Sequence, residues 1–160
     1  MKKASVVLCA LLLLLSAGSA MAQEWSAEQK EVIAQIKACW DANIRAHQDK
    51  NTDHFFAACP CEKDAYWWVT GEGAPRQFMN LEARLTAEGL YWQMKRENWL
   101  DIRPLSIKID GDVALFHGYS VWIIENYRGE IFQVEQKHFD VLRKKNGRWT
   151  YLGGMVAQKM

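Results

Sequence analysis

The feature that most constrains this chain is a pair of predicted β-hairpins in its last third, from about Asn98 to Val156. Asp110-Gly111 and Asn146-Gly147 each separate two runs rich in β-branched and aromatic residues. These dipeptides in that setting are the strongest short-range hairpin signals that a sequence contains. The chain therefore predicts consecutive antiparallel strands over Leu105–Ile109, Asp112–Trp122, Ile131–Lys144 and Arg148–Leu152.

The segments before the hairpins predict the layer that covers the sheet. Ser26 and Gln29 form a capping box, and bulky apolar residues then recur at helical spacing, which predicts an amphipathic helix from about Ala27 to Asp49. A short helix over 52–59, an aromatic strand over 64–70 and a helix from about Gln77 to Glu88, with a continuation to Arg96 left open, follow. This order predicts an α+β domain in which a strongly curved, mostly antiparallel sheet wraps around the long first helix.

The first 22 residues have the pattern of a secretory signal peptide. Met-Lys-Lys precedes an apolar run over Val6–Leu15, and Ala20-Met21-Ala22 resembles a cleavage site. We expect cleavage after Ala22, a periplasmic or secreted protein, and a single domain over 23–160. An uncleaved anchor is the alternative, but the apolar run is shorter than the roughly 20 residues that a membrane span needs. No other segment predicts contact with a membrane.

Composition narrows the classes of partner. Lysine and arginine (20) nearly balance aspartate and glutamate (19) and are interspersed with them, so the chain lacks the basic stripe of a nucleic-acid-binding protein. Eight tryptophans are a high aromatic load for this length. Such rings fill a core, line a cavity or form an interface.

Three cysteines remain after signal cleavage, and an odd number leaves one outside any intramolecular pair. In an oxidising compartment we expect a structural disulfide from Cys39 to Cys59 or Cys61. A bridge between Cys59 and Cys61 would close a small, strained ring. A zinc site using the cysteines with His47 or His54 is an alternative whose spacing matches no established pattern. We therefore expect no bound metal and no cofactor.

Two stretches carry a resemblance to a known family. Pro104–Leu115 resembles the "GD-x-A" hairpin of the NTF2-like superfamily, and His138–Trp149 resembles its final hairpin with the "dGrW" turn, as found in the SnoaL-like and DUF4440-like branches. The resemblance implies an NTF2-like cone over nearly all of the mature chain. The superfamily includes ketosteroid isomerase, polyketide cyclases, dehydratases and non-catalytic association domains, so the fold does not fix the function.

Strand alternation separates the two faces of the first hairpin. With a two-residue Asp110-Gly111 turn, one face carries Leu105, Ile107, Ile109, Ala114, Phe116, Gly118, Ser120 and Trp122, and the other carries Val113, Leu115, His117, Tyr119, Val121 and Ile123. Both faces are mostly apolar, so we expect one to meet the helices and the other a second subunit. The expected homodimer packs sheet to sheet, as the resemblance also implies; loops that cover the outer face are the alternative.

The last hairpin leaves two registers open. A two-residue Asn146-Gly147 turn groups His138, Asp140, Leu142, Trp149, Tyr151 and Met155 on one face. A three-residue turn with Gly147 left-handed would place Lys137, Phe139, Val141 and Arg143 beside Trp149, Tyr151 and Met155 instead. A change of one residue in pairing turns every side chain over.

Three side chains are the best catalytic candidates: His138, Asp140 and His117. An aspartate two residues from a histidine on one strand face can orient the ring and tune its pKa for acid–base chemistry. His117 and Tyr119 could donate to a ligand oxygen. In each case a structural or interface role is the alternative. The candidate ligand-binding rings are Tyr66, Trp68, Trp92, Tyr119, Trp122, Trp149 and Tyr151.

Three functions are compatible with these patterns. The first is an exported NTF2-like protein that binds a small apolar or aromatic molecule in its cone. The second is an isomerase, cyclase or dehydratase that uses His/Asp acid–base chemistry in the same cavity. The third is a protein–protein interaction module. Met155 stands where many SnoaL-like chains have a polar residue, often histidine, which favours the first over the second.

Overall fold

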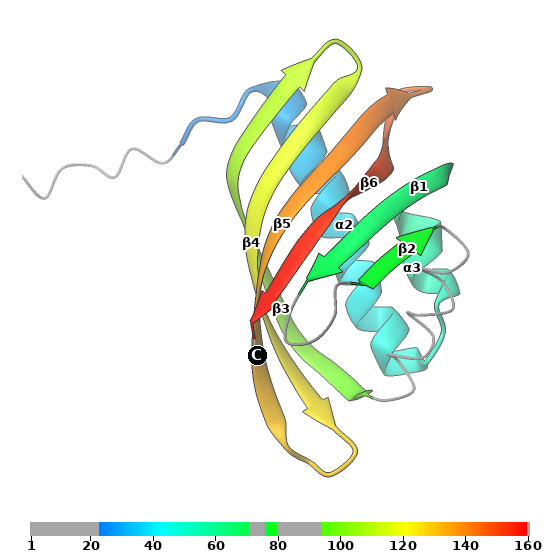
Figure 1. Ribbon diagram of the computed structural model, residues 1–160, viewed down its shortest axis with the longest axis vertical. Coiled ribbons are helices and arrows are strands. Elements are labelled where there is room, and N and C mark those ends of the chain that lie inside the picture. Colours follow the sequence, from blue (N-terminus) through cyan, green and yellow to red (C-terminus); the bar gives the residue numbers. More distant parts are fainter. Residues whose placement is uncertain (1–22, 71–75, 80–93, 160) are drawn as a thin grey trace, which may run out of the picture.

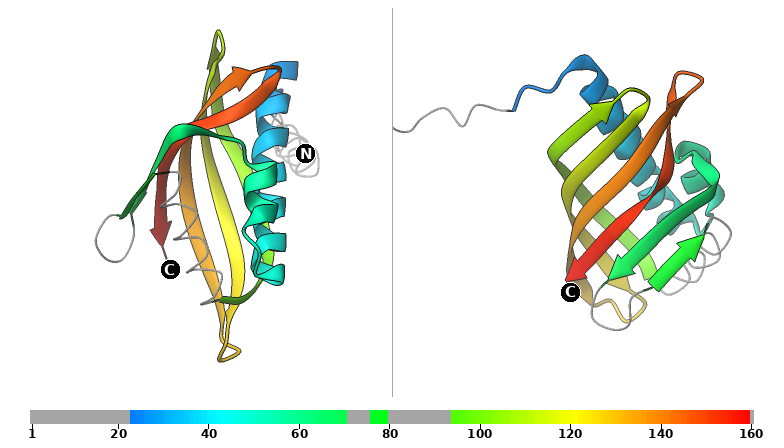
Figure 2. Two further views of the ribbon diagram at one scale, coloured as in Figure 1. Left: turned by 90° about the vertical axis from the view of Figure 1, so that its right-hand side faces the viewer. Right: turned by 45° about the horizontal axis from the view of Figure 1, so that its top comes forward.

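In the computed structural model, residues 23–70, 76–79 and 94–159 are described. Within them a long helix lies across one face of a curved, six-stranded sheet with strand order β2-β1-β6-β5-β4-β3 (Figures 1 and 2). All neighbouring strands are antiparallel except β1 and β6, which are parallel. The elements are α2 (Ala27–Asp49), α3 (Asp53–Ala58), β1 (Cys61–Thr70), β2 (Arg76–Met79), β3 (Met94–Asp110), β4 (Val113–Asn126), β5 (Ile131–Lys145) and β6 (Arg148–Lys159). The predicted α+β architecture is confirmed.

Helix α2 has the bounds that the sequence predicts. Ser26 Oγ accepts a hydrogen bond from the Gln29 amide (3.2 Å), and Gln29 Oε1 accepts one from the Ser26 amide (2.9 Å), which completes the capping box. Gln29 Nε2 also donates to the Ile107 carbonyl (2.8 Å), so the start of the helix is fixed to β3. Lys50 ends the helix in a left-handed conformation with φ 54°.

The core lies between α2 and the face of the sheet that it covers, which we call the inner face. Side chains from the helix and from β3 to β6 form one buried cluster. Its buried members include Val32, Ile36, Cys39, Ile102, Ile107, Ala114, Phe116, Leu142, Trp149 and Tyr151. Among the described residues, no helix is both long and apolar enough to cross a bilayer.

Both hairpins form where the sequence predicts them. The first turn is Gly111-Asp112, between the paired Asp110 and Val113, one residue later than expected. The side chains keep the faces that the sequence predicts. The later turn changes the partner of each residue by two positions, and a change of two preserves strand alternation. In the second hairpin Lys145 pairs with Arg148. The turn residues there both have positive φ, 52° at Asn146 and 77° at Gly147, as a type I′ turn requires.

A bulge in β3 corrects one predicted position. Pro104 pairs with Gly118 and Ser106 with His117, so Leu105 is an extra residue in the strand. Leu105 is consequently 49% exposed, rather than buried beside Ile107 on the inner face.

A second bulge, in β6, corrects the position of Met155. Leu142 pairs with Tyr151, but the next pair is Val141 with Gly153, so Leu152 is the extra residue. The bulge reverses the alternation beyond it. Met155 therefore pairs with Phe139 on the outer face and is 47% exposed, rather than sharing a face with His138.

The predicted helix from Gln77 is wrong at its start and in its possible continuation to Arg96. Residues 76–79 form β2, which pairs antiparallel with β1, and Met94 already belongs to β3, which excludes a helix continuing to Arg96. Apolar spacing over a short segment does not distinguish a helix from a strand whose pairing partners lie outside that segment. Residues 80–93, the middle of the predicted helix, lie outside the described part of the chain.

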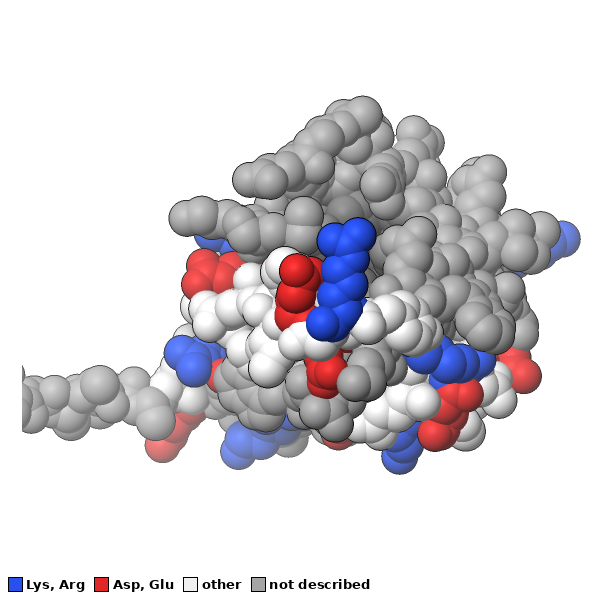
Figure 3. All heavy atoms as spheres, turned by 90° about the horizontal axis from the view of Figure 1, so that it is seen from below, with Lys and Arg blue, Asp and Glu red and all other residues white. Residues whose placement is uncertain are grey.

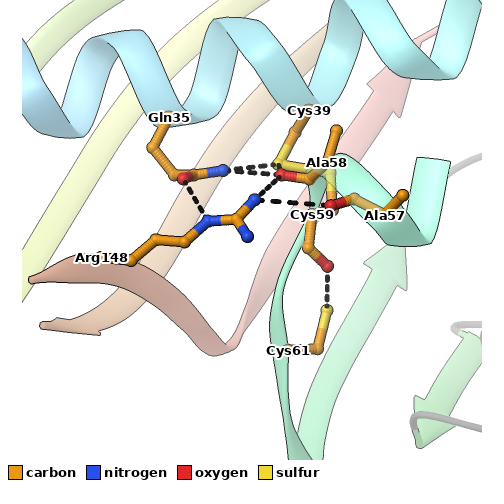
Figure 4. Close-up of a disulfide and its surroundings, with 7 residues drawn as sticks. All are labelled: Gln35, Cys39, Ala57, Ala58, Cys59, Cys61 and Arg148. Carbon is orange, nitrogen blue, oxygen red and sulfur yellow. Dashed lines mark hydrogen bonds between the residues drawn. A yellow bond between two sulfur atoms is a disulfide. The ribbon is translucent and has the colours of Figure 1, made fainter. Parts of the chain in front are cut away.

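A disulfide joins α2 to the segment that follows α3 (Figure 4). The bridge links Cys39 to Cys59, whose Cα atoms are 4.9 Å apart, and Cys61 remains a thiol that donates to the Cys59 carbonyl (3.2 Å). Gln35 Nε2 (2.8 Å) and Arg148 Nη2 (3.1 Å) both donate to the carbonyl of Ala58. The end of α3 is thus held by the helix before it and by β6.

We predict that Gly153→Ala destabilises the docking of β1 on β6. Gly153 has φ 144°, and an added Cβ would overlap the backbone carbonyl of Tyr66. Backbone strain and steric overlap together should reduce the free energy of unfolding by about 3 kcal/mol or more. Urea denaturation followed by circular dichroism measures this.

Gly129→Ala is the matched control. Gly129 also has positive φ (78°), but nothing lies within 4 Å of the added Cβ. It should cost only about 1 kcal/mol. Equal losses for the two variants would contradict the predicted steric overlap at β1.

Candidate functional site

A row of buried polar side chains runs along the inner face of β5. Gln136, His138 and Asp140 alternate along the strand, and Ser120 of β4 pairs with Gln136 in the register. All four belong to the buried part of the molecule, with exposures of 3% or less. We call these four residues the polar row. Strand alternation alone places His138 and Asp140 on one face. The two-residue turn at Asn146-Gly147, one of the two that the sequence leaves open, groups them with Trp149 and Tyr151, as the structure shows.

Ser120 is the hydrogen-bonding centre of the polar row. Its Oγ lies 2.6 Å from His138 Nε2 and accepts a hydrogen bond from Trp122 Nε1 (3.1 Å). Gln136 Oε1 is farther from the same hydroxyl, at 3.4 Å. The histidine ring is therefore oriented by Ser120, a residue that strand alternation placed on the same face as Ile107 and Phe116 without assigning it a role.

Aromatic rings border the polar row on the side of the helix. The Trp40 ring of α2 packs edge to face against His138 and against Trp122, with centroid distances of 5.3 and 5.2 Å. Trp149 and Tyr151 of β6 are buried in the same core. The polar groups thus lie in largely apolar surroundings.

Burial changes the pKa of both titratable residues of the polar row, His138 and Asp140. It lowers the pKa of His138 to about 4 and raises the pKa of Asp140 to about 7, because the charged form of each is desolvated. The imidazole is consequently neutral at pH 7, and the carboxyl is close to its midpoint. Burial also raises the pKa of Tyr151, with the charges of Asp140 and Cys61 adding to the effect.

The polar row retains two hydrogen-bonding atoms with no partner among the described residues, His138 Nδ1 and Asp140 Oδ2. The two side chains share a face but make no hydrogen bond to each other. The expectation that Asp140 orients the His138 ring therefore has no geometric support, since Ser120 is the residue that contacts the ring. A buried polar atom without a partner costs about 1–3 kcal/mol. Trp149 Nε1, in the core beneath α2, is a further such atom among the described residues.

The other candidates are distributed over both faces. His117 and Tyr119 lie on the outer face, where His117 pairs with Phe139, so neither is near the polar row. Trp122, Trp149 and Tyr151 are on the inner side, and Tyr66 is half-buried on β1. The side chains of Trp68 and Trp92 lie outside the described part.

A surface depression of about 480 Å³ lies elsewhere, near the Gly111-Asp112 turn, and has a charged lining. Its cations are close to carboxylates: Lys145 Nζ lies 3.1 Å from Glu62 and Arg143 Nε lies 3.6 Å from Asp112. The face seen in Figure 3 likewise mixes both signs of charge among the described residues. In the described ranges, no cluster of three or more histidine, cysteine or acidic side chains is arranged to hold a metal.

Comparison with solved structures identifies the fold. No protein-family model and no curated protein matches the chain. Solved structures match over most of it. An NTF-2 like protein of unknown function from Silicibacter pomeroyi is 15% identical, covers 81% of this chain and 97% of its own, and superposes with a TM-score of 0.55.

This chain has the NTF2-like fold. A ketosteroid isomerase-like protein from Erwinia carotovora atroseptica has a similar structure: it is 15% identical, the match covers 78% of this chain and 94% of the other, and the TM-score is 0.57. The association domain of CaMKII from C. elegans is 17% identical; the match covers 84% of this chain and 96% of the other, with a TM-score of 0.55. At these identities the likeness extends to the NTF2-like fold and not to an activity.

The raised pKa of Asp140 predicts a stability difference that depends on pH. The folded-state pKa of about 7 lies above the ordinary value of about 4, so the protonated carboxyl stabilises the fold fully below pH 4, and this contribution is lost as pH rises through 7. The free energy of unfolding of Asp140→Asn, taken relative to that of the wild type, should therefore increase by roughly 1.4 kcal/mol for each pH unit between pH 4 and 7.

Urea denaturation at pH 4.5 to 8 measures this difference. The difference between variants is informative because His138 acts in the opposite direction: its lowered pKa makes stability rise from about pH 4 to 6.5 in both proteins. Glu135→Gln, a charge removal on the outer face of the same strand, is the control. A difference for Asp140→Asn that does not change with pH would contradict the assigned pKa.

Proposed function

We propose that this NTF2-like protein binds a small, mostly apolar molecule between α2 and the inner face of the sheet. The observation that carries the proposal is the polar row, in which His138 Nδ1 and Asp140 Oδ2 have no hydrogen-bond partner within the described residues. A ligand that pairs these atoms would remove a cost of about 1–3 kcal/mol for each of them.

The surroundings of the polar row define the ligand further. Trp40 and Trp122 present ring surfaces next to His138, which suits a flat or apolar molecule. His138 is neutral near pH 7, and Asp140 is only partly ionised. The row therefore carries little charge, and an uncharged ligand with one or two polar groups fits it best.

The same residues favour a second candidate function, acid–base catalysis. A carboxyl with a pKa of about 7 is suited to take up and release protons near neutral pH, and Asp140 is such a group. Catalysis would additionally require a substrate proton within hydrogen-bonding reach of that carboxyl. Binding does not require such a proton and is therefore the function that we propose first.

We predict that the protein binds 2-naphthol, a flat molecule with one hydroxyl group, and that Asp140→Leu weakens the binding about tenfold. The substitution removes the polar partner from the inner face, and one lost hydrogen bond in a buried site corresponds to about this change in affinity. Isothermal titration calorimetry measures both affinities, and native mass spectrometry of freshly purified protein tests for a retained small molecule.

Asp110→Leu is the control, because Asp110 is exposed at the end of β3. It should leave the affinity unchanged. Circular dichroism establishes that each variant is folded before titration. The proposal fails if the wild type does not bind 2-naphthol and also carries no retained small molecule. It fails equally if Asp140→Leu and Asp110→Leu bind 2-naphthol with the same affinity.

We also propose that the outer face binds a second copy of the chain. Phe139 and Met155 pair in the register and are 42% and 47% exposed, and Leu115 and Val141 pair beside them. Exposed apolar side chains grouped on one sheet face are typical of an interface. The C. elegans neighbour, an association domain with the same fold, is consistent with this assembly.

Met155→Lys should convert the dimer to a monomer, because a buried lysine without a partner is costly at the centre of an apolar interface. Sedimentation velocity measures the change in mass. Phe132→Lys is the matched control: Phe132 is 43% exposed but pairs with Ile124 near the end of the inner face. A wild type that sediments as a monomer, or a Met155→Lys variant that remains dimeric, would contradict the proposed interface.

We further propose that residues 1–22 direct export to the periplasm or beyond, as the sequence predicts. The disulfide between Cys39 and Cys59 supports this location, because such bonds persist in oxidising compartments.

A further inference from the structure

Four described apolar residues form the proposed dimer interface, and Met155 is the one among them whose polarity an oxidant can change. It is 47% exposed on the outer face of β6, and Phe139, its partner in the register, is 42% exposed. Leu115 and Val141, which pair with each other beside them, have only hydrocarbon side chains. A thioether, in contrast, is oxidised by peroxides to a sulfoxide, which is polar and chiral.

The neighbours of Met155 in the sheet suit a thioether better than a sulfoxide. The register places Phe139 opposite it, Val141 diagonal to it on β5, and Ala157 next on the same face of β6. Lys137, the other diagonal neighbour, is exposed to water. When a second copy covers this face, a sulfoxide oxygen loses its water, and a Lys137 ammonium that turned toward it would lose water as well. Both losses oppose association.

We infer that Met155 is an oxidation site that controls dimer formation: hydrogen peroxide transfers one oxygen atom to its sulfur, and the resulting sulfoxide keeps the two copies apart. In this step the O–O bond of the peroxide breaks and an S–O bond forms. The thioether sulfur is oxidised, and the peroxide is reduced to water. The inference rests on the proposed dimer and names a modification that regulates it.

Oxidation and dimer formation compete for the same side chain. Peroxide reaches the exposed side chain of Met155 in a monomer, whereas a second copy covers it in the dimer. Oxidation therefore proceeds from the monomer, and its rate falls as the protein concentration and the fraction of dimer rise.

The free thiol of Cys61 does not compete for the oxidant. Burial raises the pKa of this thiol to about 12, so almost none of it is ionised at pH 7. Peroxide reacts with the thiolate rather than with the thiol. An effect of peroxide on the dimer therefore has to come from another residue.

Sedimentation velocity before and after treatment with hydrogen peroxide at pH 7 tests the inference. The treatment should raise the Kd of the wild-type dimer about a hundredfold, or about tenfold for each of the two buried sulfoxides. Mass spectrometry of proteolytic peptides should locate an added oxygen at Met155. Circular dichroism establishes that the treated protein is folded.

Met155→Leu is the matched variant, because leucine has a similar volume and no sulfur. It should remain a dimer with or without peroxide, although the other methionines of the chain are still available to the oxidant. Met155→Gln imitates the polarity of the sulfoxide and should be a folded monomer without peroxide. Methionine sulfoxide reductases should return the treated wild type to the dimer.

The oxidation rate of Met155 is a second measurement. Followed by mass spectrometry at protein concentrations well below and well above the dimer Kd, it should be about tenfold slower at the higher concentration, since only the monomer reacts.

The outcomes separate this inference from the dimer on which it rests. A wild type that sediments as a monomer before treatment rejects the dimer and the inference together. A wild type that stays dimeric after Met155 is oxidised, or whose Met155 is not oxidised even in the monomer, overturns the inference while the dimer stands. Dissociation of Met155→Leu by peroxide, or an oxidation rate independent of protein concentration, also overturns it.

Discussion

The packing of α2 against the inner face of the sheet is the contact on which the rest of the structure depends. Apolar residues of the helix recur at three- and four-residue spacing, and the strands alternate beneath them, so the two patterns meet over one face. Every second residue of β5 from Val134 to Leu142 is then removed from water whether or not it is apolar. The pKa changes of His138 and Asp140 follow from that position, since desolvation is the cause in both.

Local signals in the sequence were sufficient for α2 and for both hairpins, because a capping box and turn dipeptides act within a few residues. They were insufficient for the register beyond each turn. The bulges at Leu105 and Leu152 reverse or interrupt alternation, and neither follows from a short-range pattern. The predicted helix from Gln77 was wrong at its start, and its possible continuation to Arg96 was wrong, for a related reason: these residues pair with strands outside the segment, which periodicity within the segment does not report.

The candidate site was partly predictable for the same physical reason. Strand alternation placed His138 and Asp140 on one face, and alternation in the preceding strand placed Ser120 with Ile107 and Phe116, without showing which face the helix covers. The hydrogen bond between Ser120 and His138 depends on how β4 and β5 are aligned, and that alignment is set across the connection between Asn126 and Ile131. The sequence suggested Asp140 as the partner of His138, whereas the pairing of β4 with β5 places the Ser120 hydroxyl beside the ring.

The bulge at Leu152 links the two proposed surfaces. By reversing alternation it places Met155 beside Phe139 on the outer face and Gly154 opposite Asp140 on the inner side. A Cβ at Gly154 would lie 2.7 Å from Asp140 Oδ1, so the glycine leaves room for the carboxyl beside the backbone of β6. Without the extra residue, Met155 would occupy the inner position opposite His138, and the outer face would lose its exposed methionine. One backbone irregularity thus sets both the space around the polar row and the apolar character of the opposite face.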